Sequence, residues 1–170
     1  MRSGSGIGVA TTPFGSETWV EGSWRTKETM DNNSMEVIAI AKALELARKQ
    51  CEDQGSSCVE HVVIYSDSAN ALKLFQRNTR KREPRKARKF APLEEAISAA
   101  AELDASGVWV DLRWVPAHEG IGGNPRADKA ARNAARQGAR KVPQGFRRRG
   151  GTSLIECFMR EKKNIDIFRN

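Results

Sequence analysis

The sequence predicts an α/β protein in which one sheet is flanked by helices. Three features indicate this class: two short extended segments near the N-terminus, two apolar runs of strand length further along, and helical patterns between and after those runs. The expected order is hairpin, helix, strand, helix, helix, strand, helix, which is typical of layered α/β structures. A length of 170 residues is enough for one domain with its own core.

The N-terminal part of the chain predicts a hairpin followed by a long helix. Residues 6–10 and 17–21 are the two extended segments, and turn-forming residues over 12–16 separate them. Residues 33–50 place small and aliphatic side chains three or four positions apart, as a helix with one buried face requires. The candidates for the N-cap of this helix are Asp31, Asn32 and Asn33.

Two core strands and three further helices complete the expected fold. Residues 61–65 and 108–115 are mostly apolar and suit buried strands. The first of these strands leads directly into a strand-to-helix junction at 66–72. Further helices are expected over 91–104 and 126–137, the latter rich in alanine.

We predict a domain over residues 1–137 and a basic tail over 138–170. The tail consists of a Gly- and Arg-rich linker and a short helix expected over 152–163. Charge is distributed unevenly: residues 1–75 carry 7 basic and 10 acidic residues, whereas residues 76–170 carry 22 basic and 11 acidic ones. A basic half indicates an anionic partner such as nucleic acid, although a solvated basic surface has the same composition.

The composition excludes several classes of protein. No apolar run approaches the roughly 18–20 residues of a membrane span, so we expect no integral membrane protein and no membrane partner. The first residues lack the apolar core of a signal peptide. Cys51, Cys58 and Cys157 form no CxxC pair, which argues against a zinc site or a disulfide scaffold. We therefore expect an intracellular protein, in the nucleus or the cytoplasm.

Three acidic residues occupy positions at which chemistry often takes place in α/β proteins. Glu36 lies in the first turn of the first helix, Asp67 follows a buried strand, and Asp128 opens the helix after a Gly-rich loop. Converging carboxylates suit Mg²⁺ or Mn²⁺, and two such ions can drive phosphodiester hydrolysis. Each residue also has a purely structural interpretation, since acidic side chains stabilise and cap helix N-termini.

Four stretches in a fixed order resemble the type 1 ribonuclease H family. They are Asn32–Val37 (NNSMEV), Ile64–Ser68 (IYSDS), Trp114–Gly120 (WVPAHEG) and Gly123–Ala131 (GNPRADKAA). The resemblance covers residues 6–137 and is greatest to the ribonuclease H domains of reverse transcriptases from non-LTR retrotransposons, including fungal ones. It implies a mixed five-stranded sheet with helices on both faces, and endonucleolytic hydrolysis of the RNA strand of an RNA–DNA hybrid with two divalent ions, usually Mg²⁺.

The resemblance also assigns roles to individual residues. It implies that Glu36, Asp67 and Asp128 bind the metal ions, and that His118 assists proton transfer or product release. Asn32 and Asn33 match residues that contact the RNA minor groove, where the 2′-hydroxyl distinguishes RNA from DNA. The full set expected to contact nucleic acid is Asn32, Asn33, Ser68, Asn124, Arg80, Lys81, Arg82, Arg85 and Lys86.

Some of these roles have plain structural alternatives. His118 taken alone is a surface histidine, and Asn32 and Asn33 could be caps and nothing more. The basic stretch 77–89, with its eight positive charges and the single acid Glu83, either grips the phosphates of the hybrid or is a solvated loop.

The sequence departs from the family pattern at its start. The family has a fourth acidic residue, an Asp at the end of a first, central strand, and no acidic residue precedes Gly6 here. We expect that strand to be missing, as in a truncated gene model or a decayed, catalytically inactive copy that only binds nucleic acid. Residues 161–169 are a possible substitute strand. Possible substitute ligands are Asp31, Asp111 and Asp166, each of which also suits a surface or capping role.

Overall fold

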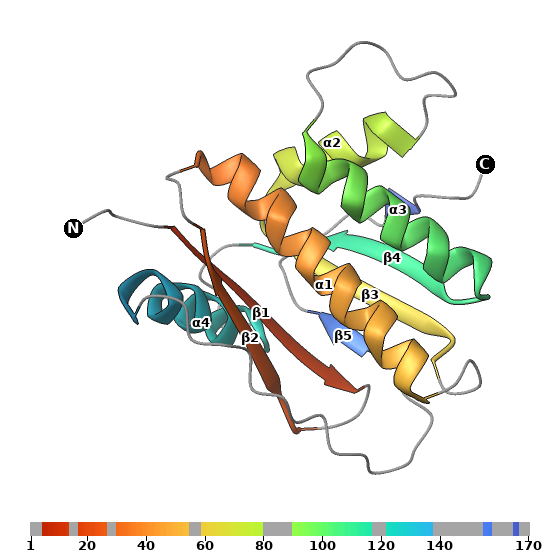
Figure 1. Cartoon of the computed structure of the whole chain (residues 1–170), viewed down its shortest axis with the longest axis horizontal. Helices are drawn as coiled ribbons and strands as arrows, with labels where there is room; N and C mark the ends of the chain where they lie inside the picture. The colour runs from red at the N-terminus through yellow and green to blue at the C-terminus, as the bar shows by residue number, and fades with distance from the viewer. Residues whose placement is uncertain are drawn as a thin grey trace.

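The computed structural model contains four helices and six strands among the residues that it describes (Figure 1). The described residues are 5–13, 17–26, 30–54, 59–79, 90–116, 122–137, 155–157 and 165–166. The strands are β1 (Gly6–Pro13), β2 (Val20–Arg25), β3 (His61–Ser66), β4 (Trp109–Trp114), β5 (Ile155–Cys157) and β6 (Ile165–Asp166). The helices are α1 (Asn32–Gln54), α2 (Ala69–Thr79), α3 (Ala91–Ala105) and α4 (Asn124–Gln137).

The strands form one mixed sheet in the order β2-β1-β5-β3-β4-β6. β1 and β2 pair antiparallel as a hairpin, and β3 and β4 pair parallel along their whole length. The parallel pair is possible because a helical connection through α2 and α3 returns the chain to the same end of the sheet. The α/β class expected from the sequence, with one ribonuclease H-like mixed sheet flanked by helices, is confirmed.

Helices cover both faces of the sheet. Val9 of β1 packs in the main core with α1, α2, α3 and the apolar residues of β3 and β4. A Cβ atom on the neighbouring Gly8 would instead meet the backbone of α4. Because successive residues of a strand point to opposite faces, α4 covers the face opposite to α1 and α3. Figure 1 shows the same arrangement, with α4 beside β1 and β2 and with α1 and α3 running across the other strands.

The centre of the sheet is completed by a segment from late in the chain. β5 pairs antiparallel with β1, from Thr11 opposite Cys157, and parallel with β3, from Val62 opposite Ile155. Among the described residues β5 occupies the place between β1 and β3. Both neighbours present backbone groups that need partners, and the short run from Ile155 to Cys157 provides them.

Two expectations for the tail differ from the structure. We expected residues 152–163 to be helical, but residues 155–157 lie in a strand, because pairing with two strands satisfies their backbone groups. Of the strand suggested for 161–169 the structure describes β6, which pairs with the outer edge of β4 and not with the centre. The division into a domain over 1–137 and a tail over 138–170 stays a prediction.

Helix boundaries differ from the expected ones by a few residues. α1 begins at residue 32 and extends to 54, and α4 begins at 124. α2 extends to Thr79, into the stretch that composition alone marked as irregular. Its buried residues Ala71, Leu72 and Phe75 explain the extension, because burial of one face stabilises a helix whatever the charge of its other face.

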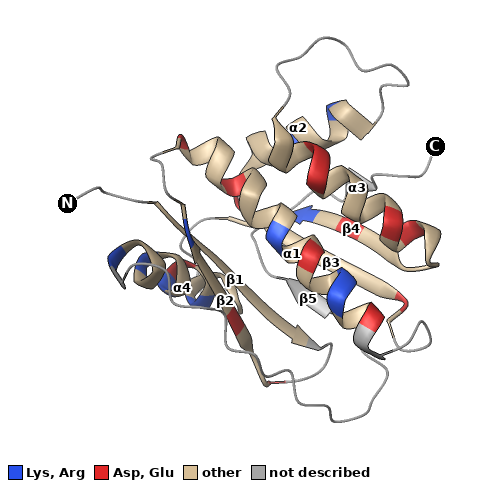
Figure 2. Ribbon diagram, viewed as in Figure 1, with Lys and Arg blue, Asp and Glu red and all other residues tan. Residues whose placement is uncertain are grey.

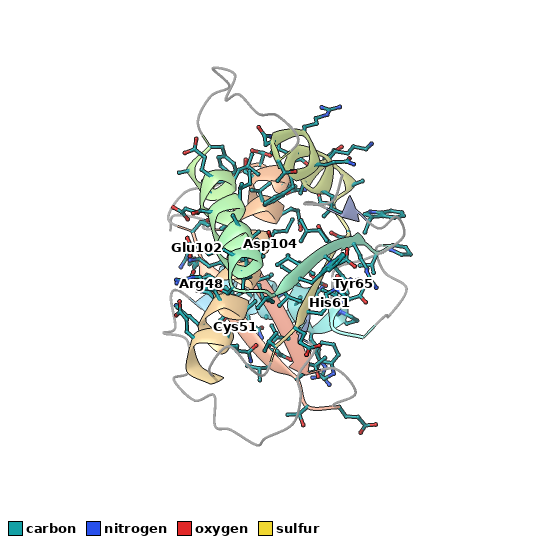
Figure 3. All side chains as sticks on the ribbon, turned by 90° about the vertical axis from the view of Figure 1, so that its right-hand side faces the viewer. Arg48, Cys51, His61, Tyr65, Glu102 and Asp104 are labelled. Carbon is teal, nitrogen blue, oxygen red and sulfur yellow. The ribbon has the colours of Figure 1, made fainter. Side chains whose placement is uncertain are left out.

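α1 and α3 meet along their C-terminal halves. Arg48 Nε lies 3.7 Å from Glu102 Oε2, and a pocket of about 190 Å³ opens beside this pair with Cys51 in its wall. Figure 3 shows Arg48, Cys51 and Glu102 together, with His61 and Tyr65 of β3 at a distance from them. The C-terminal end of α3 therefore lies beside the C-terminal half of α1.

The contact between α4 and β1 requires glycine at two positions of β1. A Cβ atom on Gly8 would lie 1.9 Å from the carbonyl oxygen of Ala127, and one on Gly6 would lie 2.0 Å from that of Ala131. Both obstacles are backbone atoms, so relief requires the helix to move. The Gly-x-Gly pattern thus sets the distance between helix and sheet.

We predict that Gly8→Ala lowers the free energy of unfolding by about 3 kcal/mol, the upper range for overpacking. Chemical denaturation monitored by circular dichroism measures this change. Ser23→Ala, at the residue of β2 that pairs with Gly8, is the control and should shift the midpoint little. An unchanged midpoint for Gly8→Ala would mean that α4 does not pack against β1 as described.

Removal of the central strand should have a larger effect. Deletion of residues 152–170 leaves β1 and β3 with unpaired edges, so we expect loss of cooperative unfolding, or aggregation through those edges. Deletion of 167–170, which retains both β5 and β6, is the control. Size-exclusion chromatography and thermal unfolding would report the difference, and a stable monomer after the longer deletion would contradict the role of β5.

Candidate active site

The N-terminus of α1 is capped by Asp31. The Ser34 backbone N–H donates to Asp31 Oδ1 at 3.0 Å, and the Ser34 hydroxyl donates to Oδ2 at 2.5 Å. These hydrogen bonds lower the pKa of Asp31. Asp31 is therefore the cap among the three candidates, and its carboxylate is already occupied. Asn32 and Asn33 become the first two residues of the helix, and both are exposed.

Glu36 lies one turn further along α1, at the edge of the core. Its side chain is largely buried, and within the described structure its Oε2 atom has no hydrogen-bond partner. Burial first, and then the charge of Asp67, raise the pKa of Glu36 from 4.5 to about 7. The structure therefore brings Glu36 and Asp67 close enough for their charges to interact, although they lie on different elements.

The backbone around Asp67 is fixed from two sides. The Trp114 indole N–H donates to the Asp67 carbonyl oxygen at 3.0 Å, and the Val115 N–H donates to the Ser66 carbonyl at 3.1 Å. These bonds hold the turn after β3 against the end of β4. Nothing in the sequence spacing of Trp114 reveals this hydrogen bond, because its partner is the residue after another strand.

Ser68 ties the same turn to the start of α2. The Ala71 backbone N–H donates to Ser68 Oγ at 3.2 Å, which makes Ser68 the N-cap of that helix. The Ser68 N–H in turn donates to the buried Ser66 hydroxyl at 3.2 Å. Asp67 is thus relieved of the capping role that sequence alone allowed, and its half-exposed carboxylate is available beside Glu36.

Asp128 takes no part in this pair. Its Oδ2 lies 2.7 Å from Nη2 of Arg132, one turn further along α4, in an exposed ion pair. Among the described residues no three His, Cys, Asp or Glu side chains gather as metal ligands. The structure therefore brings together two of the three expected ligands. Asn124 is the first residue of the same helix and is half-buried.

The residues suggested as substitutes for the fourth acidic ligand either have other partners or lie outside the described residues. Asp111 is buried and accepts a hydrogen bond of 2.9 Å from Arg113 Nε, so its charge is compensated within β4. The side chain of Asp166 lies outside the described residues, as do His118 and the expected nucleic-acid contacts of the basic segment, which are Arg80, Lys81, Arg82, Arg85 and Lys86.

The Glu36–Asp67 pair has the donor chemistry of a magnesium site. Two neighbouring carboxylates of like charge are stabilised together by a shared cation. Mg²⁺ prefers oxygen ligands, retains several waters, and is commonly held by only one or two carboxylates together with substrate phosphates. The unpartnered oxygen of Glu36 supplies a ligand that no protein group occupies in the described structure. One divalent cation therefore fits this pair.

Comparison with known proteins identifies the family. The sequence model of RNase H matches residues 1–136, so the chain belongs to the RNase H family. Among curated proteins, none matches the chain. None of the described helices is long and apolar enough to cross a membrane. Membership of this family makes ribonuclease activity on RNA–DNA hybrids the general expectation for the site.

The raised pKa of Glu36 predicts a pH-dependent stability of the metal-free protein. The stabilisation linked to its protonation is complete below about pH 4.5 and is lost as the pH rises through about 7. At pH 8 we expect metal-free Glu36→Gln to be more stable than wild type by about 3 kcal/mol, a difference that becomes small near pH 4.5. Urea denaturation across this range measures it.

Titration of the Glu36 carboxyl group itself tests the same pKa shift directly, with Asp67→Asn as the matched variant. Carboxyl carbon NMR should give Glu36 a pKa of about 7 in the wild type and a lower one in Asp67→Asn, because the charge of Asp67 contributes to the shift. A pKa near 4.5 in the wild type would show that the two carboxylates do not face one another.

Proposed function

We propose that this protein is an RNA–DNA hybrid ribonuclease that cleaves within the RNA strand with the help of divalent metal ions. The observation that carries the proposal is the Glu36–Asp67 pair, held by a helix start and a strand end in a chain of the RNase H family. Helix capping by Asp31 and Ser68 leaves both carboxylates out of the local hydrogen bonding.

Each proposed role rests on a position in the structure or in the motifs. Glu36 and Asp67 hold a metal ion, and Glu36 also contacts the 2′-hydroxyl of the RNA. The exposed Asn32 and Asn33 lie one turn before Glu36 and contact the minor groove. Asn124 and Ser68 contact the backbone nearby. The proposal gives His118 the role of assisting proton transfer, and the basic segment 80–86 that of gripping phosphates.

Divalent ions, Mg²⁺ or Mn²⁺, supply activation of water and stabilisation of the leaving oxygen in this chemistry. We propose two ions, with Asp128 as ligand to one of them once Arg132 releases it. The ion pair is exposed, with side chains 46% and 60% accessible for Asp128 and Arg132, so its loss costs at most about 1 kcal/mol. Asp128 is therefore able to exchange Arg132 for a metal ion.

A second candidate function is binding of nucleic acid without cleavage. It is favoured by one observation: the described part of the chain gathers two carboxylates and no third ligand. In either case we propose an origin in a retrotransposon reverse transcriptase, with the domain acting within a larger polyprotein in the nucleus or the cytoplasm.

Cleavage of an end-labelled RNA–DNA hybrid in Mg²⁺ separates the two functions. We expect internal cuts in the RNA strand, loss of at least about 100-fold in rate in Asp67→Asn, and no cleavage in EDTA. The matched control is Asp104→Asn, an exposed aspartate of α3. Asp104 lies far from the proposed site. It is at the end of α3 that Arg48 contacts, and Arg48 is about 18 Å along α1 from Glu36.

The two variants make the result decisive. Cleavage that survives Asp67→Asn would overturn the assignment of the site. Binding of the hybrid with no cleavage by the wild type would favour the second function.

A further inference from the structure

The outer face of α4 is a row of basic side chains on the sheet face opposite to α1 and α3. Ala127, Ala130 and Ala134 of this helix are buried against the sheet. Its exposed basic residues, three or four positions apart, are Arg126, Lys129, Arg132 and Arg136. Figure 2 shows the positive charges along the helix. This row is called the α4 basic row below. Of its four residues, the proposed active site involves only Arg132, through its ion pair with Asp128.

Two of the four charges are neutralised within the protein. Arg126 Nη1 lies 3.4 Å from Glu21 Oε1, and its guanidinium lies 5.8 Å from the centre of the Trp19 ring. Arg132 is paired with Asp128. Lys129 and Arg136 have no ion-pair partner among the described residues. The row therefore presents two uncompensated charges, on Lys129 and Arg136. The other two basic side chains can leave their weak, exposed ion pairs to bind an anion.

We propose that the α4 basic row binds the phosphate backbone of a nucleic-acid duplex, as an anchor separate from the catalytic edge. From Arg126 to Arg136 the row is about 15 Å long. One strand of a duplex offers a phosphate about every 3.4 Å of axis, so the row spans about four phosphates. The chemistry is that of ion pairing with phosphate alone, so the anchor does not distinguish RNA from DNA.

A second copy of this chain is a competing partner for the α4 basic row, because the chain also has an acidic surface. α3 carries Glu94, Glu95, Glu102 and Asp104 and no basic residue, so its surface complements the α4 basic row of another copy. Two observations favour nucleic acid over a second copy. Glu102 is already engaged by Arg48, and α4 is continuous in sequence with a further basic stretch over 140–149.

The double variant Lys129→Gln/Arg136→Gln tests the proposal, because it removes only the two uncompensated charges. The control variant Ala91→Glu/Ala101→Glu changes the net charge equally, at exposed positions of α3. Binding of a 20-base-pair RNA–DNA hybrid and of a DNA duplex of the same sequence is measured in EDTA from 50 to 300 mM KCl. EDTA prevents cleavage, so the result does not depend on catalysis.

We expect the double variant to bind both duplexes several-fold more weakly at low salt. Its plot of log K against log salt should be shallower by about 1.8, the value for two lost phosphate contacts, while the control retains the slope of the wild type. An unchanged slope would overturn the proposal, as would an equal loss in the control. Sedimentation showing that the wild type is dimeric and the double variant monomeric, with unchanged slopes, would overturn it in favour of a second copy.

The inference shares its class of ligand with the proposed function, but the two can fail separately. A wild type that binds in EDTA with the expected slopes and does not cleave in Mg²⁺ overturns only the proposed function. A wild type that cleaves in Mg²⁺, with a double variant of unchanged slope, overturns only the anchor.

Discussion

The sheet depends on one constraint: the facing edges of β1 and β3 must both find hydrogen-bond partners. The hairpin and the parallel β3–β4 pair are each complete by themselves, but they become one sheet only through β5. Three residues join the half that carries α4 to the half that carries Asp67. The relation between the two halves, and hence the distance from α4 to the Glu36–Asp67 pair, therefore depends on a strand far shorter than those it connects.

The Glu36–Asp67 pair shows how helix capping and a proposed active site share the same short segments without competing. Each helix start has an acidic or hydroxyl side chain for the free N–H groups: Asp31 for α1 and Ser68 for α2. Because those groups are satisfied, Glu36 and Asp67 remain free to face one another. Burial, and after it the charge of Asp67, raise the pKa of Glu36, which is the cost of holding two carboxylates together at the edge of the core.

Local sequence patterns predicted most of the helices and strands. The elements whose place depends on pairing between distant segments could not be predicted. The hairpin, the apolar runs that became β3 and β4, and α1, α3 and α4 follow from periodicity and caps. β5 could not be predicted, because a three-residue strand carries no periodic signal and its place is set by two distant edges. The motifs predicted Glu36 and Asp67 as metal ligands, which stays a prediction, and the structure brings the two residues close together. The pairing of Asp128 with Arg132 depends on a local contact that the motif does not contain.

The position of β5 has a consequence for the order in which the molecule folds. Residues 11 and 157 must meet before the sheet is complete, so residue 157 has to leave the ribosome before the centre of the sheet can close. Pairing across such a sequence separation is slow, and the two half-sheets wait with open edges in the meantime. Synthesis rate and chaperone access during that interval would then govern how much of the protein escapes misassembly in the cell.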